Sequence, residues 1–216
     1  MRLFLVGLAL LTLAGIIFAF VAWVRERAGK EPFPAGAADA LLHPARRLIQ
    51  PVASTIDAFR LQLGDVALEL GPGPGYFTPT AARAVAPGGR LLCLDLQPDM
   101  LTRLRSRIAG AADNVDLVVA DAQRLPLRDA VIDNAFLVSI LGEVPDESLA
   151  VSELRRVIRP GGLLSFSETF RDPDYVREGA LRDWCAAAGF DLVARRRQLL
   201  GYTARFRAAR MSGGSM

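Results

Sequence analysis

Three glycines spaced every second residue, Gly71, Gly73 and Gly75, follow a short apolar run that is interrupted only by Glu69. Glycine at a strand-to-helix turn lets the backbone come close to a ligand, and the free amides of the following helix favour an anionic group. Another acidic side chain, Asp95, ends the next apolar run about 20 residues later, a spacing at which a carboxylate meets the ribose hydroxyls of a bound nucleotide. The pattern therefore predicts a site for a cofactor that contains a nucleoside.

The spacing of the glycines distinguishes two kinds of cofactor. Dehydrogenases that bind a nicotinamide dinucleotide have the pattern G-x-G-x-x-G or G-x-G-x-x-A, but Tyr76 occupies the place of the third small residue here. Pro72 and Pro74 also remove two amide donors, so the loop is a poor site for a pyrophosphate and suits a smaller anion such as an amino-acid carboxylate. A nicotinamide-dependent oxidoreductase or epimerase remains the alternative interpretation.

Alternating strand-like and helix-like stretches must position these residues. The strand-like runs are 66–70, 90–95, 115–120, 131–138 and 163–167, and the helical patterns between and after them are 78–86, 98–109, 146–158 and 173–188. Two further runs, 191–198 and 202–208, are joined by a short turn and predict a C-terminal antiparallel hairpin. We therefore expect an α/β fold with a doubly wound, mostly parallel, seven-stranded Rossmann-like sheet. Ligands of such sheets bind outside the carboxyl ends of the strands.

Four motifs in this order resemble the class I S-adenosylmethionine-dependent methyltransferases of the UbiE-like, methyltransferase-11 type. Residues 68–75, Leu-Glu-Leu-Gly-Pro-Gly-Pro-Gly, are similar to the first motif of that family, and residues 92–95 are similar to its acidic second-strand end. Asp121-Ala122 with Leu-Pro-Leu at 125–127 resembles the segment beside the adenine, and residues 154–162 resemble the helix and R-P-G-G turn before the fifth strand. The resemblance implies a methyltransferase that uses S-adenosyl-L-methionine and releases S-adenosyl-L-homocysteine.

The same resemblance implies a role for each motif residue of this sequence. The residues expected to hold the methionine moiety are Glu69, Gly71, Gly73 and Gly75. Asp95 would bind the two ribose hydroxyls, because a carboxylate accepts from both in charge-assisted hydrogen bonds. Leu96 and Asp121 with Ala122 would border the adenine.

The catalytic residues are less well defined. The methyl group of the cofactor is already activated, so the protein chiefly aligns the acceptor, excludes water and, where needed, removes a proton. The candidates for contact with the acceptor are Ser139, Glu143, Glu168 and the single histidine, His43. His43 also fits a helix start or the surface, and Glu143 also fits a solvated loop. No metal site is expected, because Cys93 and Cys185 lie in apolar patterns without metal-ligand spacing.

Nucleic acid is not an expected partner. Methyltransferases that modify amino groups of nucleic-acid bases carry Asn/Asp-Pro-Pro-aromatic after the fourth strand, where this chain has Ser-Ile-Leu-Gly at 139–142. The formal net charge is only +3, and acidic residues are dispersed among the basic ones.

The N-terminal run, residues 3–24, holds no charged side chain and as a helix would extend about 33 Å, enough to cross a bilayer. A cleaved signal peptide is the alternative, but large side chains such as Phe20 and Trp23 fit a cleavage site poorly. More basic residues follow the run than precede it, which predicts a cytoplasmic C-terminal domain. The expected divisions are a transmembrane anchor at 1–25, a linker at 26–38, an N-terminal helical segment at 39–62, a methyltransferase domain at 63–210 and a flexible tail at 211–216.

The combined hypothesis is a membrane-anchored methyltransferase that acts on a small or lipophilic acceptor, such as a quinone, an isoprenoid, a lipid headgroup or a thiol. Besides the nicotinamide enzyme, a non-catalytic module that binds S-adenosylmethionine is an alternative. The segment 39–62 is interpreted either as short helices on the domain edge or as an interfacial lid whose Arg46 and Arg47 contact anionic headgroups. The oligomeric state is left open.

Overall fold

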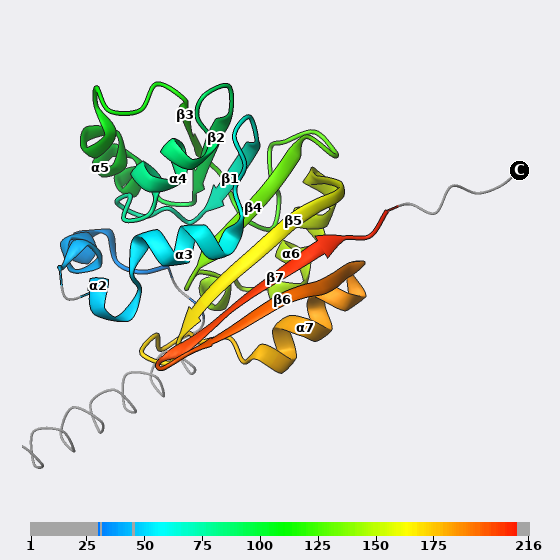
Figure 1. The fold of residues 1–216 in the computed structure, drawn as a ribbon. Helices are drawn as coiled ribbons and strands as arrows, with labels where there is room; N and C mark the ends of the chain where they lie inside the picture. The colour runs from blue at the N-terminus through cyan, green and yellow to red at the C-terminus, as the bar shows by residue number, and fades with distance from the viewer. Residues whose placement is uncertain (1–29, 31, 45, 211–216) are drawn as a thin grey trace, which may run out of the picture.

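A seven-stranded mixed sheet forms the centre of the computed structural model, which describes residues 30, 32–44 and 46–210 (Figure 1). Its strand order is β3-β2-β1-β4-β5-β7-β6. The strands are β1 (Val66–Leu70), β2 (Arg90–Asp95), β3 (Val115–Val119), β4 (Ile132–Val138), β5 (Ile158–Thr169), β6 (Phe190–Gln198) and β7 (Gly201–Ala208). β1 to β5 pair in parallel, whereas β7 runs antiparallel to both of its neighbours. The predicted α/β sheet with a C-terminal antiparallel hairpin is confirmed.

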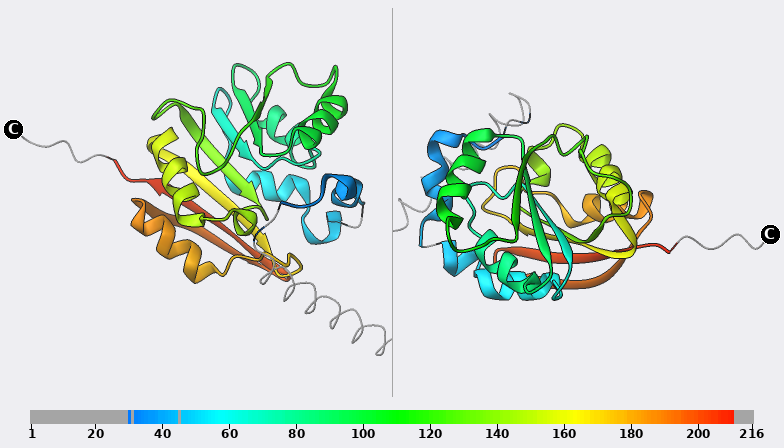
Figure 2. Two further views of the ribbon diagram at one scale, coloured as in Figure 1. Left: turned by 180° about the vertical axis from the view of Figure 1, so that it is seen from behind. Right: turned by 90° about the horizontal axis from the view of Figure 1, so that it is seen from above.

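Helices cover both faces of the sheet (Figure 2). The helices on one face are α3 (Val52–Phe59), α4 (Thr78–Val85) and α5 (Pro98–Ile108), and those on the other are α6 (Glu147–Val157) and α7 (Glu178–Ala187). Successive strand residues point to opposite faces, so Leu137 joins the core beneath α6 while Phe136 stacks on Phe59 of α3 at 5.0 Å between ring centroids. Burial on both faces explains why these strands read as nearly continuous apolar runs.

The helix expected at 173–188 begins only at Glu178, so the prediction that it starts near Pro173 is wrong. Residues 172–177 form a loop instead. The carboxylate of Asp172 accepts the backbone amide of Asp174 at 2.9 Å, which closes a local turn rather than capping a helix. This loop follows β5 and comes to border the cavity described below.

Three short helices precede β1: η1 (Ala35–Leu42), α2 (Arg46–Ile49) and α3. Residues 35–38, which the sequence analysis places in a linker, therefore lie in a helical turn. The expected anchor at 1–25 and the expected tail at 211–216 fall outside the described residues. Among the residues that the structure describes, no helix combines the length and the apolar character needed to span a membrane.

Candidate functional site

A cavity of about 810 Å³ lies outside the carboxyl ends of the parallel strands. Its volume falls within the range of about 300–1,000 Å³ that is typical of small-molecule sites. The predicted site residues that line it are Gly71, Gly73, Asp95, Leu96, Asp121, Ala122, His43, Ser139 and Glu143. Three predicted residues do not line it: Glu69, Gly75 and Glu168. The fold thus brings the loops after β1 to β5 together around one space, as expected for a doubly wound sheet.

The glycine loop after β1 has all three glycines at positive φ, 68° at Gly71, 54° at Gly73 and 87° at Gly75. Their amides are already engaged within the protein. Gly71 donates to a carbonyl of β2 at 2.8 Å, Gly73 to the carboxylate of Asp95 at 3.1 Å, and Gly75 to a carbonyl within the loop at 3.1 Å. Because the two prolines have no amide hydrogen, residues 71–75 offer no free backbone donor to a pyrophosphate.

Gly75 and Glu69 support the loop from behind. A Cβ at Gly75 would lie 2.3 Å from a terminal methyl of Leu104 in α5, so any other residue would force this buried side chain to shift. The Glu69 carboxylate is buried on the face covered by α4, where it accepts the hydroxyl of Thr78 at 2.7 Å. Burial raises the pKa of Glu69 to about 7, although the hydrogen bonds from Thr78 and Cys93 oppose the shift.

Asp95 ends β2 at the rim of the cavity with only 8 % of its surface exposed. One carboxylate oxygen accepts the amide of Gly73 at 3.1 Å, and the other accepts the amide of Gln97 at 2.9 Å. Burial raises the pKa of Asp95, and these two amides oppose the shift. Since a carboxylate has about four acceptor positions, both oxygens retain capacity for the hydroxyls of a ribose.

Beside Asp95 the rim is suited to a flat ring. Leu96 is 53 % exposed although it is a large apolar residue, and it lines the cavity. Asp121 and Ala122 border the cavity from the end of β3, where the Asp121 carboxylate accepts the amide of Gln123 at 2.8 Å. An apolar surface beside polar acceptors fits an adenine, so the positions of these residues agree with the expected roles, which remain predictions.

The other half of the cavity holds the candidates for contact with an acceptor. Ser139 follows β4 in the left-handed region, with a φ of 52°, and its hydroxyl receives the side-chain amide of Gln50 at 3.4 Å. His43 also lines this half. Glu168 does not reach it: the side chain is 1 % exposed, and burial raises its pKa well above the ordinary value. Glu168 therefore belongs to the wall behind the cavity.

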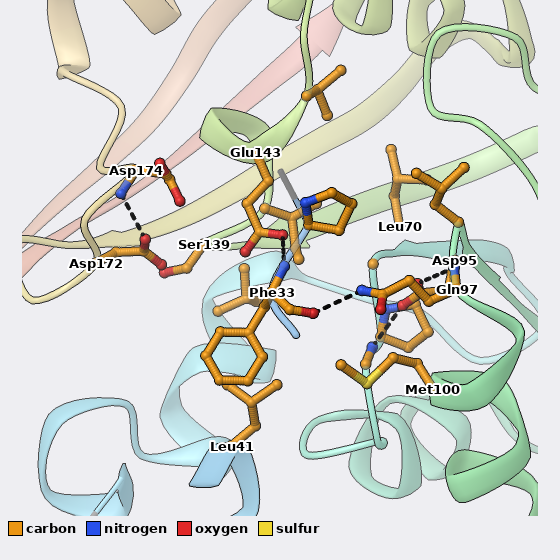
Figure 3. Close-up of a pocket in the computed structure, with 18 of the residues that line it drawn as sticks. Phe33, Leu41, Leu70, Asp95, Gln97, Met100, Ser139, Glu143, Asp172 and Asp174 are labelled. Carbon is orange, nitrogen blue, oxygen red and sulfur yellow. Dashed lines mark hydrogen bonds between the residues drawn. The ribbon is translucent and has the colours of Figure 1, made fainter. Parts of the chain in front are cut away.

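A segment that the sequence analysis missed crosses the mouth of the cavity, residues 32–43, which we call the strap. The amide of Phe33 donates to the carboxylate of Glu143 at 2.8 Å, and its carbonyl accepts the side-chain amide of Gln97 at 2.8 Å (Figure 3). Gln97 follows β2 and Glu143 ends η2 (Leu141–Glu143) after β4. One residue of the strap therefore joins the two sides of the cavity. The sequence signal was an aromatic residue between two prolines in an apparent linker.

Arg46, which one interpretation of the helical segment assigns to headgroup contact, has its contacts in the structure within the protein. Its guanidinium lies 4.6 Å from the ring centroid of Tyr76 and donates to Gln50 at 2.9 Å and to the Leu41 carbonyl at 3.0 Å. Burial lowers the pKa of Arg46. The residue thus fastens the strap and α2 to the glycine loop, whereas its neighbour Arg47 is exposed.

Comparisons with known proteins agree with this geometry. Residues 68–166 match a family model described as "Methyltransferase domain". The ubiquinone/menaquinone biosynthesis C-methyltransferase UbiE of Pasteurella multocida is 35% identical over 124 residues, which cover 55% of this chain and 46% of that protein. The malonyl-[acyl-carrier protein] O-methyltransferase of Methylococcus capsulatus is 42% identical over 100 residues, or 46% of this chain and 36% of that protein. The chain thus spans less than half the length of these curated relatives.

A solved structure is similar over more of the chain. The crystal structure of a SAM-dependent methyltransferase from Aquifex aeolicus superposes with a TM-score of 0.77 at 18% identity, and the match covers 82% of this chain and all of that one. At this identity the likeness concerns the fold alone. The fold, the glycine loop and the acidic end of β2 nevertheless occur together in the part of the chain that the structure describes.

Proposed function

We propose that this chain, which carries an S-adenosylmethionine-dependent methyltransferase domain, transfers the methyl group to a small or lipophilic acceptor at a membrane. The observation that supports the proposal is a single cavity with two different halves. One half contains the glycine loop and Asp95, and the other contains Ser139 and Glu143. A cofactor and an acceptor bound in these halves would share one space beneath the strap.

The residues of the cavity fit S-adenosylmethionine. The cavity volume of about 810 Å³ leaves room for a second molecule beside a cofactor of this size. The glycines place backbone rather than side chains at the cavity wall, Asp95 offers acceptors for a ribose, and Leu96 offers an apolar surface for an adenine.

The bound cofactor supplies a methyl group on a positively charged sulfur, which needs no further activation. The remaining tasks of the protein are to align the acceptor with the methyl group and to exclude water. Asp95 would fix the position of the ribose, and Phe33 of the strap bridges Glu143 and Gln97 at the mouth. Removal of an acceptor proton would fall to Glu143 or His43, which both line the acceptor half.

The proposed acceptor is lipophilic because apolar side chains contribute to the walls of the cavity, among them Leu41, Ile140, Val144 and Pro145. Two relatives described above are named for ubiquinone/menaquinone biosynthesis and for the O-methylation of malonyl-[acyl-carrier protein]. A quinone, an isoprenoid, a lipid headgroup or a thiol all remain within this class. The proposed location is a single-pass membrane anchor formed by residues 3–24, with the methyltransferase domain in the cytoplasm.

The nicotinamide alternative is weakened by the engaged glycine amides, because a pyrophosphate needs free donors at this loop. Calorimetry with S-adenosylmethionine and with NADH tests the choice directly. We expect heat of binding with the first and none with the second.

Transfer of a labelled methyl group from S-adenosylmethionine to a membrane lipid extract tests the activity. A labelled product that partitions into organic solvent supports the proposal. Cofactor binding without any labelled lipid, quinone or thiol product would instead favour the non-catalytic module.

A further inference from the structure

Three large apolar side chains are exposed on segments that adjoin the residues lining the cavity. Leu48 of α2 is 88% exposed, Leu199 in the turn between β6 and β7 is 95% exposed, and Phe170, which follows β5, is 51% exposed. The turn and the end of β5 are neighbours, since the amide of Phe170 donates to the Leu200 carbonyl at 2.8 Å. α2 and this turn lie at the same end of the molecule (Figure 1). Exposed apolar side chains gathered at one end indicate an interaction site.

The charges that flank these side chains are basic. Arg47 lies next to Leu48, Arg171 lies next to Phe170, and Arg197 precedes the turn that carries Leu199; all three arginines are exposed. Two acidic residues, Asp172 and Asp174, follow Arg171 in the chain, and all three line the cavity. Apolar side chains bordered by arginine are the composition with which proteins contact anionic lipid surfaces.

The chain itself limits how far this surface can lie from a membrane. The uncharged run ends at Val24, and Lys30 lines the cavity. Fully extended, the segment between them reaches at most about 22 Å. If residues 3–24 span a bilayer, the cavity mouth is therefore held close to the bilayer surface.

We propose that the mouth surface, formed by Leu48, Phe170 and Leu199 with Arg47 and Arg171, rests on an anionic lipid bilayer, so that the acceptor enters the cavity from the membrane. This inference rests on the proposed membrane location but not on methyl transfer. It gives a reason for the exposure of Leu48 and Leu199, which the described residues do not bury. Lipid contact shields their apolar surface, which is worth about 25 cal/mol for each Å² removed from water.

Site-specific fluorescence of the full chain in vesicles tests the proposal. Cys93 and Cys185 are both buried, so a single introduced cysteine can be labelled selectively with the environment-sensitive fluorophore NBD. The test variants are Leu48→Cys and Leu199→Cys. Leu63→Cys is the matched control, because Leu63 is 68% exposed but precedes β1, at the opposite end of the strands from the cavity.

In vesicles of phosphatidylcholine and phosphatidylglycerol, we expect the labels at positions 48 and 199 to shift to the blue and to lose intensity when nitroxide-labelled lipids are included. The label at position 63 should show neither change. Equal behaviour at all three positions would overturn the proposal. Protection of positions 48 and 199 that is insensitive to the nitroxide lipids would also overturn it, because a second copy of the chain would then cover the surface.

The optical result does not depend on catalysis, so it separates this inference from the proposed function. Lipid contact without methyl transfer would support the mouth surface and contradict the proposed enzymatic activity. Methylation of a lipid extract without lipid contact would support the proposed activity and contradict the mouth surface.

Discussion

The carboxylate of Asp95 has two partners inside the protein, the amides of Gly73 and Gln97, and it still faces the cavity. It therefore fixes the loop after β1 relative to the start of α5 as well as offering oxygens to a ribose. The position of this residue was predictable because a strand end and a motif coincide there. Its internal partners were not, since they depend on how two loops approach one another in space.

Replacement of Asp95 by alanine should weaken the binding of S-adenosylmethionine about 100-fold, or about 3 kcal/mol, because charge-assisted bonds to the ribose are lost. Calorimetry measures the change. Asp99→Asn is the control, since Asp99 is exposed in the first turn of α5 and does not line the cavity. Unchanged affinity in Asp95→Ala, with the control also unchanged, would remove Asp95 from the cofactor site.

Strand alternation indicates which face of the sheet Glu69 occupies. Ala67 and Glu69 share the face of β1 that is covered by α4, whereas Leu68 and Leu70 point the other way. Since side chains two residues apart share a face, Glu69 could be expected to face α4. Its predicted contact with the methionine moiety remains untested, and the structure places it beside Thr78.

The raised pKa of Glu69 predicts a dependence of stability on pH. Between its ordinary value of 4.5 and its value of about 7, the folded protein binds more protons than the unfolded chain, so the free energy of unfolding falls as the pH rises through this window. Glu69→Gln removes the titration and keeps an acceptor for Thr78. We expect the variant to gain about 3 kcal/mol relative to the parent between pH 4 and pH 8, as measured by urea unfolding. A difference that does not change with pH would contradict the buried carboxylate.

Gly71 combines a positive φ with a close neighbour, because a Cβ there would lie 2.6 Å from the Ile140 side chain. Gly71→Ala should therefore lose more stability than the left-handed backbone alone costs, which is about 1–2 kcal/mol. Gly64→Ala is the matched control: φ at Gly64 is 85°, and no atom lies within 4 Å of the added Cβ. Thermal unfolding of both variants isolates the steric contribution. Equal losses would show that Ile140 moves aside freely.

The elements of the sheet were largely predictable, whereas the segments around its cavity were not. β1 and β2 follow from apolar periodicity because burial on both faces imposes it. The loop 172–177 and the strap have no such periodicity. Their conformations depend on single hydrogen bonds to distant residues, such as that between Phe33 and Glu143, which are 110 positions apart in the chain.

The strap allows two roles of Glu143 to be distinguished. Glu143→Gln keeps an oxygen that can accept the Phe33 amide but removes the base, whereas Glu143→Ala removes both. We expect Glu143→Ala to speed the hydrogen exchange of the Phe33 amide and Glu143→Gln to leave it protected, because the bond at 2.8 Å needs only an acceptor.

Methyl transfer by the same pair then reports on catalysis. Activity that survives in Glu143→Gln and falls in Glu143→Ala would make Glu143 a positioning residue. Gln97→Ala is the control from the opposite side of the cavity, because it releases the Phe33 carbonyl without touching any candidate base. Loss of activity in Glu143→Gln with normal exchange of the Phe33 amide would point to proton removal instead.

For the whole molecule, the class of enzyme and the cofactor predicted from four motifs agree with the match of residues 68–166 to a family model described as "Methyltransferase domain". The solved structure from Aquifex aeolicus supports the predicted fold. The spaced glycines, the acidic strand end and the R-P-G-G turn can be recognised in the sequence because each is tied to the local course of the backbone. No comparable motif in the sequence identifies the acceptor. Its half of the cavity is assembled from the strap, α2 and the loops after β4 and β5, which lie far apart in the sequence.

The proposed anchor makes a prediction about the full chain. After extraction of membranes with alkaline carbonate, the protein should remain in the pellet. The double variant Leu11→Arg and Ile16→Arg should move to the supernatant, because each arginine at the centre of a spanning helix costs about 2.5–3.5 kcal/mol. The control is Arg47→Gln with Arg171→Gln, which leaves the run at 3–24 unchanged. Retention of the double variant in the pellet would contradict a spanning role for the run.

The direction of β7 has a practical consequence. Because β7 runs antiparallel to β5, Ala208 lies at the end of the sheet remote from the cavity, where Ala209 bonds to the Gly189 carbonyl. A fluorescent protein or affinity tag joined after the last strand would project away from the cofactor site and from the strap. The full chain can therefore be immobilised or imaged through that end while the mouth of the cavity stays accessible.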